Sequence, residues 1–387
     1  MKNNIIKKNG KYTCTKFKQC GGCSYDFDYL EQIQRKQSIA SARLSRFGKV
    51  KDIIAMDEPY RYRCKVSRVY RAAKNGRLIA GVFKSKSRTS VPAPDCMLED
   101  KRLCEIAWGL GDIFTKYRIA PYDFDTKKGV LKHVMLRKGH RTGQILLCIV
   151  TAQAIKNAKG LTSAITERFP DITTIAENIS PRSAPMLMGR QETVLYGKGY
   201  IEDDILGLRF RISSTSFMQV NPTQSERLYS AARDMLGEST QSIMDAYCGT
   251  GTIGLICAGN AKKLTGVELT PAAVEDAQRN AKENGVDNAE FICADAAKYM
   301  KQLSDNGGTL DVLIVDPPRA GLDRVFIEAI DRLRPKQIIY ISCSLDSLAR
   351  DLSFIRKLGY KAEEIQPVDM FPHTRHIEFV VKISSIA

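Results

Sequence analysis

The sequence predicts an α/β protein whose second half is a doubly wound parallel sheet and whose first half is a smaller, β-rich region. The chain has 387 residues, which exceeds one ordinary domain. From about residue 224, helical patterns alternate with short buried strands, and repeated βα units form parallel sheets. The net charge of +16 is uneven, because residues 1–210 hold 39 Lys/Arg and 20 Asp/Glu, whereas residues 211–387 hold 20 and 23. We therefore expect two domains, 1–210 and 211–387.

The excess of positive charge in the first half indicates a polyanionic partner. It is densest between Arg61 and Ser90, where ten basic residues occur without an acid. Apolar and basic residues alternate over 60–66, which predicts a strand with a cationic outer face. Asn75-Gly76 predicts a type I′ turn, and residues 78–83 the returning strand. Any one of these cations is typical of a solvated face, but the whole cluster favours phosphate binding.

The remaining elements follow in chain order. In the first half we expect short strands at 134–137 and 144–151 and a helix at about 156–169. In the second half the pattern predicts helices at 224–236, from 254, at 271–284 and at 325–333, and strands at 242–247, 263–268, 290–293, 310–315 and 337–342.

The first βα turn of the predicted sheet has the spacing of a nucleotide-binding loop. Gly249, Gly251 and Gly254 fit Gly-x-Gly-x-x-Gly between a strand and a helix, where a ligand can approach the backbone at the helix N-terminus. Glu268 ends the next strand, where a carboxylate can accept hydrogen bonds from ribose hydroxyls, and Asp295 ends the third. A nicotinamide-dependent oxidoreductase has the same features, so this turn alone leaves both classes open.

Two further motifs favour an enzyme that holds a flat base beside S-adenosylmethionine. Asp316-Pro317-Pro318 follows the fourth strand, and the two prolines predict a rigid turn that presents Asp316 at the mouth of the site. Cys343 and Glu378 lie further on, and a thiolate beside a carboxylate suits chemistry at an unreactive ring carbon. Taken singly, Cys343 is typical of a buried core cysteine and Glu378 of a surface acid.

Eleven cysteines in a chain of this length suggest metal or catalytic roles rather than a disulfide framework. Cys14, Cys20 and Cys23 supply three thiols within ten residues, and Cys96 can complete four. Four sulfur ligands suit a structural zinc or an iron–sulfur cluster. The spacing favours the cluster, because structural zinc generally uses two close cysteine pairs. We expect the other cysteines outside the candidate site to lie in the core: Cys64, Cys104, Cys148, Cys248, Cys257 and Cys293.

Together these motifs make the chain resemble the S-adenosylmethionine-dependent RNA uracil-5-methyltransferases. Six ordered pieces carry the resemblance: Cys14-x5-Cys20-Gly21-Gly22-Cys23, 216–221, 245–254, 316–321, Ser342-Cys343 and His376-Ile377-Glu378. The resemblance implies a Rossmann-like class I methyltransferase domain after an iron–sulfur, RNA-binding region. It implies that Cys343 is the nucleophile and Glu378 the base. It also implies that Gln219, Tyr247, Glu268 and Asp316 hold the methyl donor, and that Cys14, Cys20, Cys23 and Cys96 hold a [4Fe–4S] cluster.

Two departures from the family pattern bear on the substrate. Ser344-Leu345 follow the cysteine where Asn-Pro is usual, which concerns the positioning of the nucleotide. There is no room before Cys14 for the small N-terminal barrel of many members, so the resemblance points to the shorter branch that methylates 23S ribosomal RNA. A tRNA uracil-5-methyltransferase is the alternative within the family. A nicotinamide-dependent enzyme and a non-catalytic RNA-binding protein are the alternatives outside it.

The sequence also gives expectations for location and assembly. No run of 18 apolar residues occurs, and residues 1–11 are polar and basic rather than signal-like, so we expect a cytoplasmic protein without a membrane partner. We expect a monomer whose partner is RNA.

Overall fold

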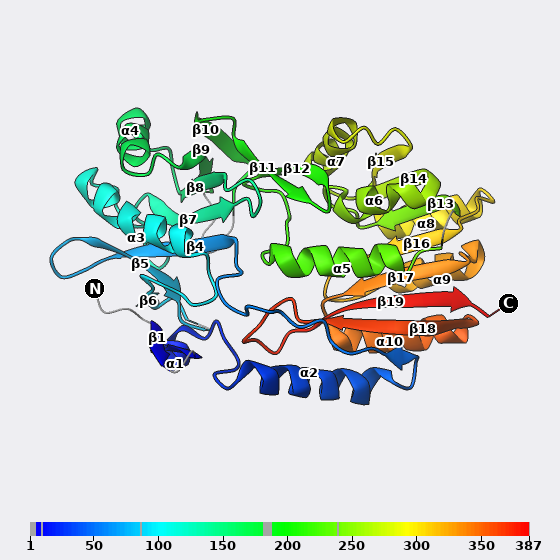
Figure 1. Cartoon of the computed structure of the whole chain (residues 1–387). Coiled ribbons are helices and arrows are strands. Elements are labelled where there is room, and N and C mark those ends of the chain that lie inside the picture. Colours follow the sequence, from blue (N-terminus) through cyan, green and yellow to red (C-terminus); the bar gives the residue numbers. More distant parts are fainter. Residues whose placement is uncertain (1–4, 9–10, 86, 181–187, 238–239, 387) are drawn as a thin grey trace. The chain divides into compact units, whose positions relative to one another are not determined.

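The chain divides into two compact units that are each assembled from separate parts of the sequence (Figure 1). The structure is a computed structural model that describes residues 5–8, 11–85, 87–180, 188–237 and 240–386. Unit 1 comprises 1–26, 59–204 and 211–222, and unit 2 comprises 27–58, 205–210 and 223–387. These contact-based units differ from the expected ranges 1–210 and 211–387 at three segments: 27–58 and 205–210 group with unit 2, and 211–222 groups with unit 1.

Unit 2 is built on an eight-stranded sheet in the order β15-β14-β13-β16-β17-β19-β18-β3. The five strands from β15 to β17 are parallel, and β19 is antiparallel to both of its neighbours. The strands are β3 (Lys49–Val50), β13 (Thr240–Ala246), β14 (Ala261–Glu268), β15 (Ala289–Cys293), β16 (Val312–Val315), β17 (Gln337–Ser342), β18 (Tyr360–Val368) and β19 (Glu378–Ser385). The expected doubly wound sheet is confirmed, and the chain reverses its direction of winding at β13, where such sheets bind ligands.

Helices surround this sheet and supply its core. They are α2 (Tyr29–Leu44), α5 (Pro222–Asp234), α6 (Thr252–Cys257), α7 (Pro271–Glu283), α8 (Ala296–Asp305), α9 (Arg324–Leu333) and α10 (Leu345–Lys357), with a short 3₁₀ turn at Ala258–Asn260. One buried cluster joins the sheet to α2, α8, α9 and α10 through residues such as Leu44, Met300, Phe326 and Leu348. Four helices packed on one face fix that face of the sheet, and therefore the strand ends that carry the candidate site.

Unit 1 contains a seven-stranded sheet in the order β10-β9-β8-β7-β4-β5-β6 and a two-stranded pair, β1-β2. The strands are β1 (Ile5–Lys8), β2 (Lys11–Cys14), β4 (Lys65–Ala72), β5 (Leu78–Phe83), β6 (Ser90–Pro92), β7 (Leu131–Lys138), β8 (Ile145–Thr151), β9 (Ile172–Ile179) and β10 (Gln191–Tyr196). Its helices are α1 (Phe17–Cys20), α3 (Lys101–Lys116) and α4 (Ala158–Arg168). A further hairpin consists of β11 (Tyr200–Ile205) and β12 (Leu208–Ser213). Its residues 205–210, which include the turn, group with unit 2, and its other residues group with unit 1.

The basic hairpin forms as predicted from β4 and β5, but its turn and its charges differ from the expectation. Gly76 has a φ of 78°, whereas Asn75 does not enter the left-handed region, so the turn is not type I′. Ala73 N donates to Arg77 O, which makes the loop longer than two residues.

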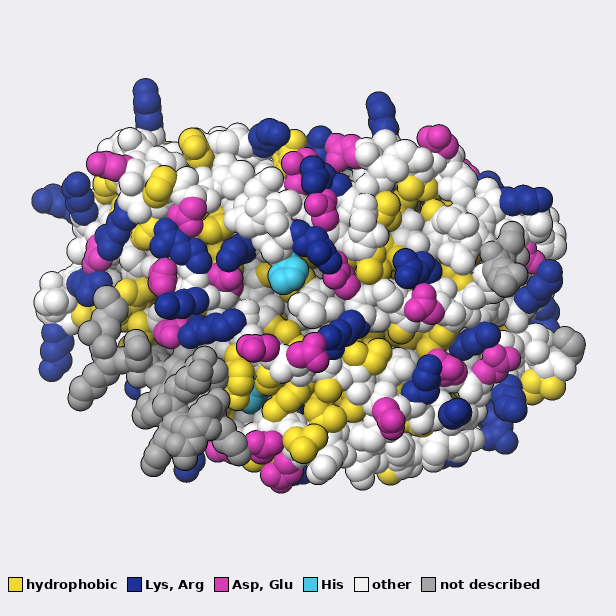
Figure 2. All heavy atoms as spheres, in the orientation of Figure 1, with side chains coloured by type: hydrophobic (Ala, Val, Ile, Leu, Met, Phe, Trp, Pro, Cys, Tyr) yellow, Lys and Arg dark blue, Asp and Glu magenta, His cyan; other side chains and the backbone are white. Residues whose placement is uncertain are grey.

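Many cations of the stretch 61–90 are paired with acids from elsewhere in unit 1. Arg68 is fully buried and paired with Glu99, and Arg61 donates to both carboxylate oxygens of Asp95 at 2.5 and 2.9 Å. Acidic and basic side chains also lie interspersed on the face shown in Figure 2. Acids are absent only from the stretch itself, and acids from elsewhere in unit 1 neutralise several of its cations. Lys86 lies outside the described residues.

The expectation that six further cysteines lie in the core is confirmed for four of them. Cys104, Cys148, Cys248 and Cys257 are buried as predicted, but Cys293 is exposed at the end of β15, and Cys64 is half-buried. Within the described parts of the chain, no helix is both long and apolar enough to cross a membrane.

Candidate active site

Cys343 directly follows β17, and Glu378 begins the neighbouring strand β19, at the edge of unit 2 where the parallel strands end. In the antiparallel pair β17 and β19, Ser342 lies opposite Phe379. Continuing this register by one residue places Cys343 opposite Glu378. Opposed residues in such a pair have Cβ atoms about 4.5–5.5 Å apart and point to the same face. The structure thus brings together the thiol and the carboxyl group that the sequence suggested as a pair.

Asp316 and Arg319 complete this group with one negative and one positive charge. Asp316 follows β16, the parallel neighbour of β17, so its side chain starts from the same edge of the sheet. Its charge raises the pKa of both Cys343 and Glu378, whereas Arg319 lowers both and hydrogen-bonds the Cys343 side chain. The four side chains therefore form one electrostatically coupled cluster.

Burial makes the carboxyl groups of this cluster titrate near neutral pH. Glu378 is 4% exposed, and desolvation, followed by the charge of Asp316, raises its pKa to about 8. Desolvation raises the pKa of Asp316 to about 7. Burial also raises the pKa of the Cys343 thiol, and Glu378 and Asp316 add to this effect while Arg319 opposes it. A carboxyl group with a pKa near the working pH is suited to proton transfer.

Helix α10 fixes the turn that carries Asp316 and Arg319. Asp351 Oδ2 accepts hydrogen bonds from Leu322 N at 2.8 Å and from Tyr340 Oη at 2.6 Å. Arg350 Nη2 donates to Ala320 O at 2.7 Å. Since α10 begins two residues after Cys343, the same helix follows the thiol and holds the neighbouring turn.

Ser344 and Leu345, which stand where the family usually has Asn-Pro, form the start of helix α10. Ser344 is the N-cap of α10, and its side chain accepts a hydrogen bond from Ser347 N at 3.4 Å. Serine and asparagine are both favoured N-caps, and proline is favoured at the first helical position, which Leu345 occupies here. The two dipeptides therefore serve the same local structure, the start of this helix.

The glycine turn after β13 combines tight packing with an open position. A Cβ at Gly254 would lie 2.9 Å from Asp245 Oδ2, which accepts a hydrogen bond from Gly254 N at 2.8 Å. Gly249 has a φ of 55°, and a Cβ there would meet no atom within 4 Å. Tyr247 also has a left-handed φ of 66°, and its ring stacks on Phe326 with centroids 5.6 Å apart. The turn thus leaves space beside Gly249 that a ligand can use.

Glu268 and Asp295 mark the ends of the next two strands. Glu268 Oε2 accepts from Gly249 N at 3.2 Å and Oε1 from Thr270 N at 2.8 Å, so the carboxylate is held beside the glycine turn. Asp295 is the N-cap of α8 and accepts from Lys298 N at 3.0 Å. Tyr247, Glu268 and Asp316 all lie at the carboxyl edge of this sheet.

Gln219, the fourth residue expected at the donor, belongs to unit 1. Its carbonyl oxygen accepts from the Cys64 thiol at 3.7 Å, and the next carbonyl, of Val220, accepts from Cys64 N at 2.9 Å. These contacts hold its backbone against the start of the basic hairpin. Its role toward the donor stays a prediction.

The four cysteines expected to hold a cluster line one cavity of about 280 Å³ in unit 1. Burial raises the pKa of Cys23 and of Cys96 to about 12 and also raises that of Cys14. Cys20 lies close enough to raise the pKa of both Cys14 and Cys23 further. Bound cations reverse this effect, because they favour the deprotonated thiol.

The four thiols that line this cavity are a donor set that suits either a structural zinc or an iron–sulfur cluster. No three or more His, Cys, Asp or Glu side chains in the described chain are arranged to hold a metal ion. Four thiolates around one zinc ion lie roughly 3.8 Å apart, given Zn–S bonds of about 2.3 Å in a tetrahedron. The ligands of a [4Fe–4S] cluster are cysteines, each bound to a separate iron atom.

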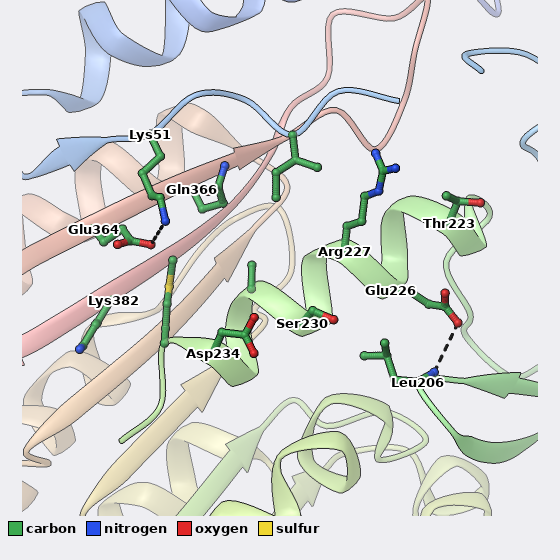
Figure 3. Close-up of a pocket in the computed structure, with 13 residues that line it drawn as sticks. Lys51, Leu206, Thr223, Glu226, Arg227, Ser230, Asp234, Glu364, Gln366 and Lys382 are labelled. Carbon is green, nitrogen blue, oxygen red and sulfur yellow. Dashed lines mark hydrogen bonds and ion pairs between the residues drawn. The ribbon is translucent and has the colours of Figure 1, made fainter. Parts of the chain in front are cut away.

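A second cavity, of about 680 Å³, lies in unit 2 beside α5, β18 and β19 (Figure 3). Its charged lining is largely paired, with Lys51 Nζ 2.8 Å from Glu364 Oε1 and Leu206 N donating to Glu226. Its lining does not include Cys343, Glu378 or Asp316. The chemistry of the candidate site therefore lies elsewhere in this unit.

Comparison with known proteins identifies the family. The sequence profile described as tRNA (Uracil-5-)-methyltransferase matches residues 187–385, which include the glycine turn, Asp316, Cys343 and Glu378. The chain belongs to the tRNA (uracil-5-)-methyltransferase family. It is accordingly an S-adenosylmethionine-dependent RNA methyltransferase, and the resemblance inferred from the sequence is confirmed.

Similar proteins match nearly the whole chain. An uncharacterized RNA methyltransferase of Clostridium acetobutylicum is 38% identical over 99% of this chain and 86% of its own length. One from Listeria innocua is 38% identical over 96% of this chain and 83% of its own. The crystal structure of the Pyrococcus abyssi tRNA (uracil-54, C5)-methyltransferase with S-adenosyl-L-homocysteine has a TM-score of 0.77, at 23% identity over 99% of this chain and 92% of that one. This likeness confirms the Rossmann-like methyltransferase fold.

Several residues of the site were not singled out from the sequence. Arg319 stood in a quoted motif without a role, and its contact with Cys343 emerges only when β16 and β17 are side by side. Tyr229 of α5 is buried, and the charges of Asp316, Glu378 and Asp245 add to the effect of burial in raising its pKa. A tyrosine inside an amphipathic helix gives no signal of such neighbours. Asp351 of α10 likewise gives no sequence signal that it contacts Leu322 and Tyr340.

Proposed function

We propose that this methyltransferase adds a methyl group to carbon 5 of a uridine through a covalent adduct between Cys343 and carbon 6. The cross-strand placement of Cys343 and Glu378, beside Asp316 and Arg319, is the observation that carries the proposal. Carbon 5 of uracil is a weak nucleophile, and addition of a thiolate to carbon 6 makes it reactive. A methyltransferase acting on a nucleophilic ring nitrogen needs no such thiol.

Cys343 supplies the thiolate. As the sulfur–carbon 6 bond forms, the electron pair of the ring double bond moves to oxygen 4 and gives an enolate. The thiol must first lose its proton to solvent, and the guanidinium of Arg319 favours the resulting anion. Asp316 opposes that charge least when its carboxyl group is protonated, a state that its raised pKa makes accessible at neutral pH. Glu378 is a carboxylate in this step, because it must accept a proton later.

S-adenosylmethionine supplies an electrophilic methyl group. We assign its binding to Tyr247 and Glu268 at the glycine turn, to Asp316, and to Gln219. Glu268 holds the turn through Gly249 N and lies where ribose hydroxyls are bound in sheets of this type. The enolate electron pair forms the bond from carbon 5 to the methyl group, the sulfur–methyl bond of the donor breaks, and S-adenosylhomocysteine leaves. Carbon 5 then carries both the methyl group and its original proton.

Glu378 removes that proton. The electrons of the carbon 5–hydrogen bond rebuild the ring double bond, and the bond between carbon 6 and the Cys343 sulfur breaks, which releases methylated RNA. The buried carboxylate is a stronger base than an exposed one because burial raises its pKa to about 8. Positioned proton transfer of this kind contributes about 10²–10⁴ in rate.

We propose 23S ribosomal RNA as the substrate, with tRNA as the second candidate. The resemblance favours the first, whereas the description of the matching profile names tRNA. Because recognition depends on the shape of a folded RNA and on unstacking the base, both RNAs belong in the test. Sequencing both RNAs from a strain that lacks the protein identifies the uridine that loses its methyl group.

We further propose that Cys14, Cys20, Cys23 and Cys96 hold a [4Fe–4S] cluster. Their convergence on one cavity supports this assignment, as does the all-thiol donor set. In this proposal the cluster has a structural role, since it ties the segment before residue 24 to the hairpin region.

Two substitutions test the catalytic assignment. Cys343→Ala should abolish methylation and any covalent RNA adduct while still binding S-adenosylmethionine. Glu378→Gln should allow addition and methyl transfer but not proton removal, so that a methylated protein–RNA adduct remains on a denaturing gel. Turnover by Cys343→Ala would refute the mechanism, and rapid product release by Glu378→Gln would assign the base role to another residue.

A further inference from the structure

The segment 369–377 leads directly into Glu378, and its first residue is bonded in four places. It joins β18 to β19, where Val368 pairs with Glu378. Asp369 is fully buried. Its N donates to Ile54 O, and its O accepts from Gln224 Nε2, both at 3.0 Å. Its Oδ1 accepts from Lys36 Nζ at 2.5 Å and its Oδ2 from Tyr29 Oη at 2.8 Å.

Helix α2 contacts this segment at two further residues. Gln32 Oε1 accepts from His373 N at 2.9 Å, and Gln32 Nε2 lies 3.2 Å from His373 Nδ1. Lys36 Nζ also donates to Phe371 O at 3.2 Å. Since residues three and four apart share a helix face, Tyr29, Gln32 and Lys36 form one polar stripe. In Figure 1, α2 runs beside β18 and α10 within this unit.

Packing alone does not account for this stripe. Gln32 and Lys36 are completely buried, and a buried charge is costly unless it is paired and hydrogen-bonded. Apolar residues at these positions would pack α2 against the sheet without that cost. His373 has a φ of 66°, a left-handed conformation that a non-glycine residue keeps only when its surroundings hold it. The polar stripe therefore fixes the backbone of 369–373 in one conformation.

We infer that Tyr29, Gln32 and Lys36 are positioning residues for Glu378. By fixing the connection at 369, 371 and 373, they hold the start of β19 so that the Glu378 carboxylate meets carbon 5 of the ring bound to Cys343. The inference rests on the proposed function, because it requires Glu378 to be the base. A displaced base slows proton removal and leaves thiol addition and methyl transfer unaffected, so methylated adduct accumulates.

The test compares substitutions on the same helix. Gln32→Ala removes the bonds to His373 and the bond to Phe27 O, and Tyr29→Phe removes the hydroxyl that bonds to Asp369 and accepts from Met56 N. Lys36 is kept, because without it Asp369 would be a buried, unpaired charge. Gln37→Ala is the matched control, since this glutamine lies on α2 but bonds to Lys51 O and Ile53 N. Glu378→Gln serves as the reference for a blocked base.

Adduct is followed on denaturing gels after mixing with substrate RNA and S-adenosylmethionine that carries a labelled methyl group. The adduct formed by Gln32→Ala should decay roughly 10–100-fold more slowly than the wild-type adduct, as expected for a misplaced catalytic group. The adduct formed by Tyr29→Phe should also decay more slowly, by a smaller factor. The KM for S-adenosylmethionine should stay within error of wild type in both variants. Gln37→Ala should behave as wild type.

Three results contradict the inference in distinguishable ways. Wild-type adduct decay in both Gln32→Ala and Tyr29→Phe, with adduct trapped in Glu378→Gln, refutes the positioning role and leaves the proposed function intact. Equal slowing in Gln37→Ala assigns the effect to the stability of the helix rather than to the bonds. Failure of Glu378→Gln to trap adduct refutes the proposed base, and the positioning role with it.

Discussion

At the scale of single residues, the chemistry of Cys343 depends on the charges around it. Two carboxyl groups oppose the thiolate and one guanidinium favours it, so the protonation of Glu378 and Asp316 is coupled to that of the thiol. The sequence allowed Cys343, Glu378 and Asp316 to be singled out, because each stands at a predicted strand end or in a motif. It gave no sign of Arg319 as the contact of Cys343 or of Tyr229 as a buried neighbour, because those relations arise from strand order and helix packing.

The raised pKa of Glu378 predicts the pH dependence of adduct decay. Burial and Asp316 favour the protonated carboxyl, so Glu378 is a carboxylate only as the pH rises through about 8. The decay rate of methylated adduct should therefore increase from pH 6 and level off above about 8, as measured by quenching at fixed times. Decay independent of pH between 6 and 9 would be evidence against Glu378 as the base.

At the scale of elements, helix α2 was not predicted because its buried face is polar. Gln32 and Lys36 occupy positions where a sequence pattern expects apolar residues, although Asp28 supplies a clear N-cap. Helix α3 was missed although its apolar spacing is regular. Its two glycines, 109 and 111, lower helix propensity and allow Phe169 and Leu78 to approach closely. Helix α8 was also missed, but the other βα elements from α5 to β17 were predicted to within a few residues, because each joins a buried strand to an amphipathic helix.

The N-cap of α10 gives a prediction about stability. Ser344→Ala removes the side-chain acceptor for Ser347 N and should lower the free energy of unfolding by about 1 kcal/mol. Ser344→Asn restores an equally good cap and should change it by only a few tenths of that amount. Denaturant titration of both variants measures the difference. Equal destabilisation by alanine and asparagine would mean that Ser344 does not act as a cap.

At the scale of the whole molecule, the borders of the two units depend on contacts between distant parts of the chain. The segment 27–58 joins unit 2 although the chain passes through unit 1 on either side of it. The place of this segment in unit 2 depends on tertiary contacts such as that between Lys36 and Asp369, which are 333 residues apart in the sequence. The local lack of acids over 61–90 likewise did not reveal that Glu99 and Asp95 pair with its arginines.

RNA binding should depend on the exposed cations of unit 1 rather than on the buried ones. Lys74→Ala with Lys84→Ala removes two exposed charges near the hairpin and should lower the slope of log affinity against log salt by about 0.7–0.9 per lost contact. The control pair Lys262→Ala and Lys298→Ala removes two exposed charges from unit 2. Binding measured at several salt concentrations decides the matter, and an unchanged slope in the first pair would exclude the hairpin as a phosphate contact.

The cysteine cavity predicts the metal content of the protein. Anaerobically purified protein should be brown and should contain iron and acid-labile sulfide, and Cys23→Ser should lose both, because its thiol lines the cavity. Cys293→Ser should retain them, since this cysteine is exposed in unit 2. Colourless protein with stoichiometric zinc would contradict the cluster while leaving the methyltransferase activity unaffected.

The central claim is that Cys343 forms a bond to carbon 6 and that a base then removes the proton from carbon 5. RNA containing 5-fluorouridine tests it most directly, because fluorine replaces that proton and cannot be removed as one. Wild-type enzyme with S-adenosylmethionine should give a stable, methylated protein–RNA adduct, and mass spectrometry of the digested complex should place the nucleotide on the peptide that contains Cys343. Stoichiometric methylation of normal RNA without any adduct to the fluorinated RNA, or an adduct on another residue, would contradict the claim.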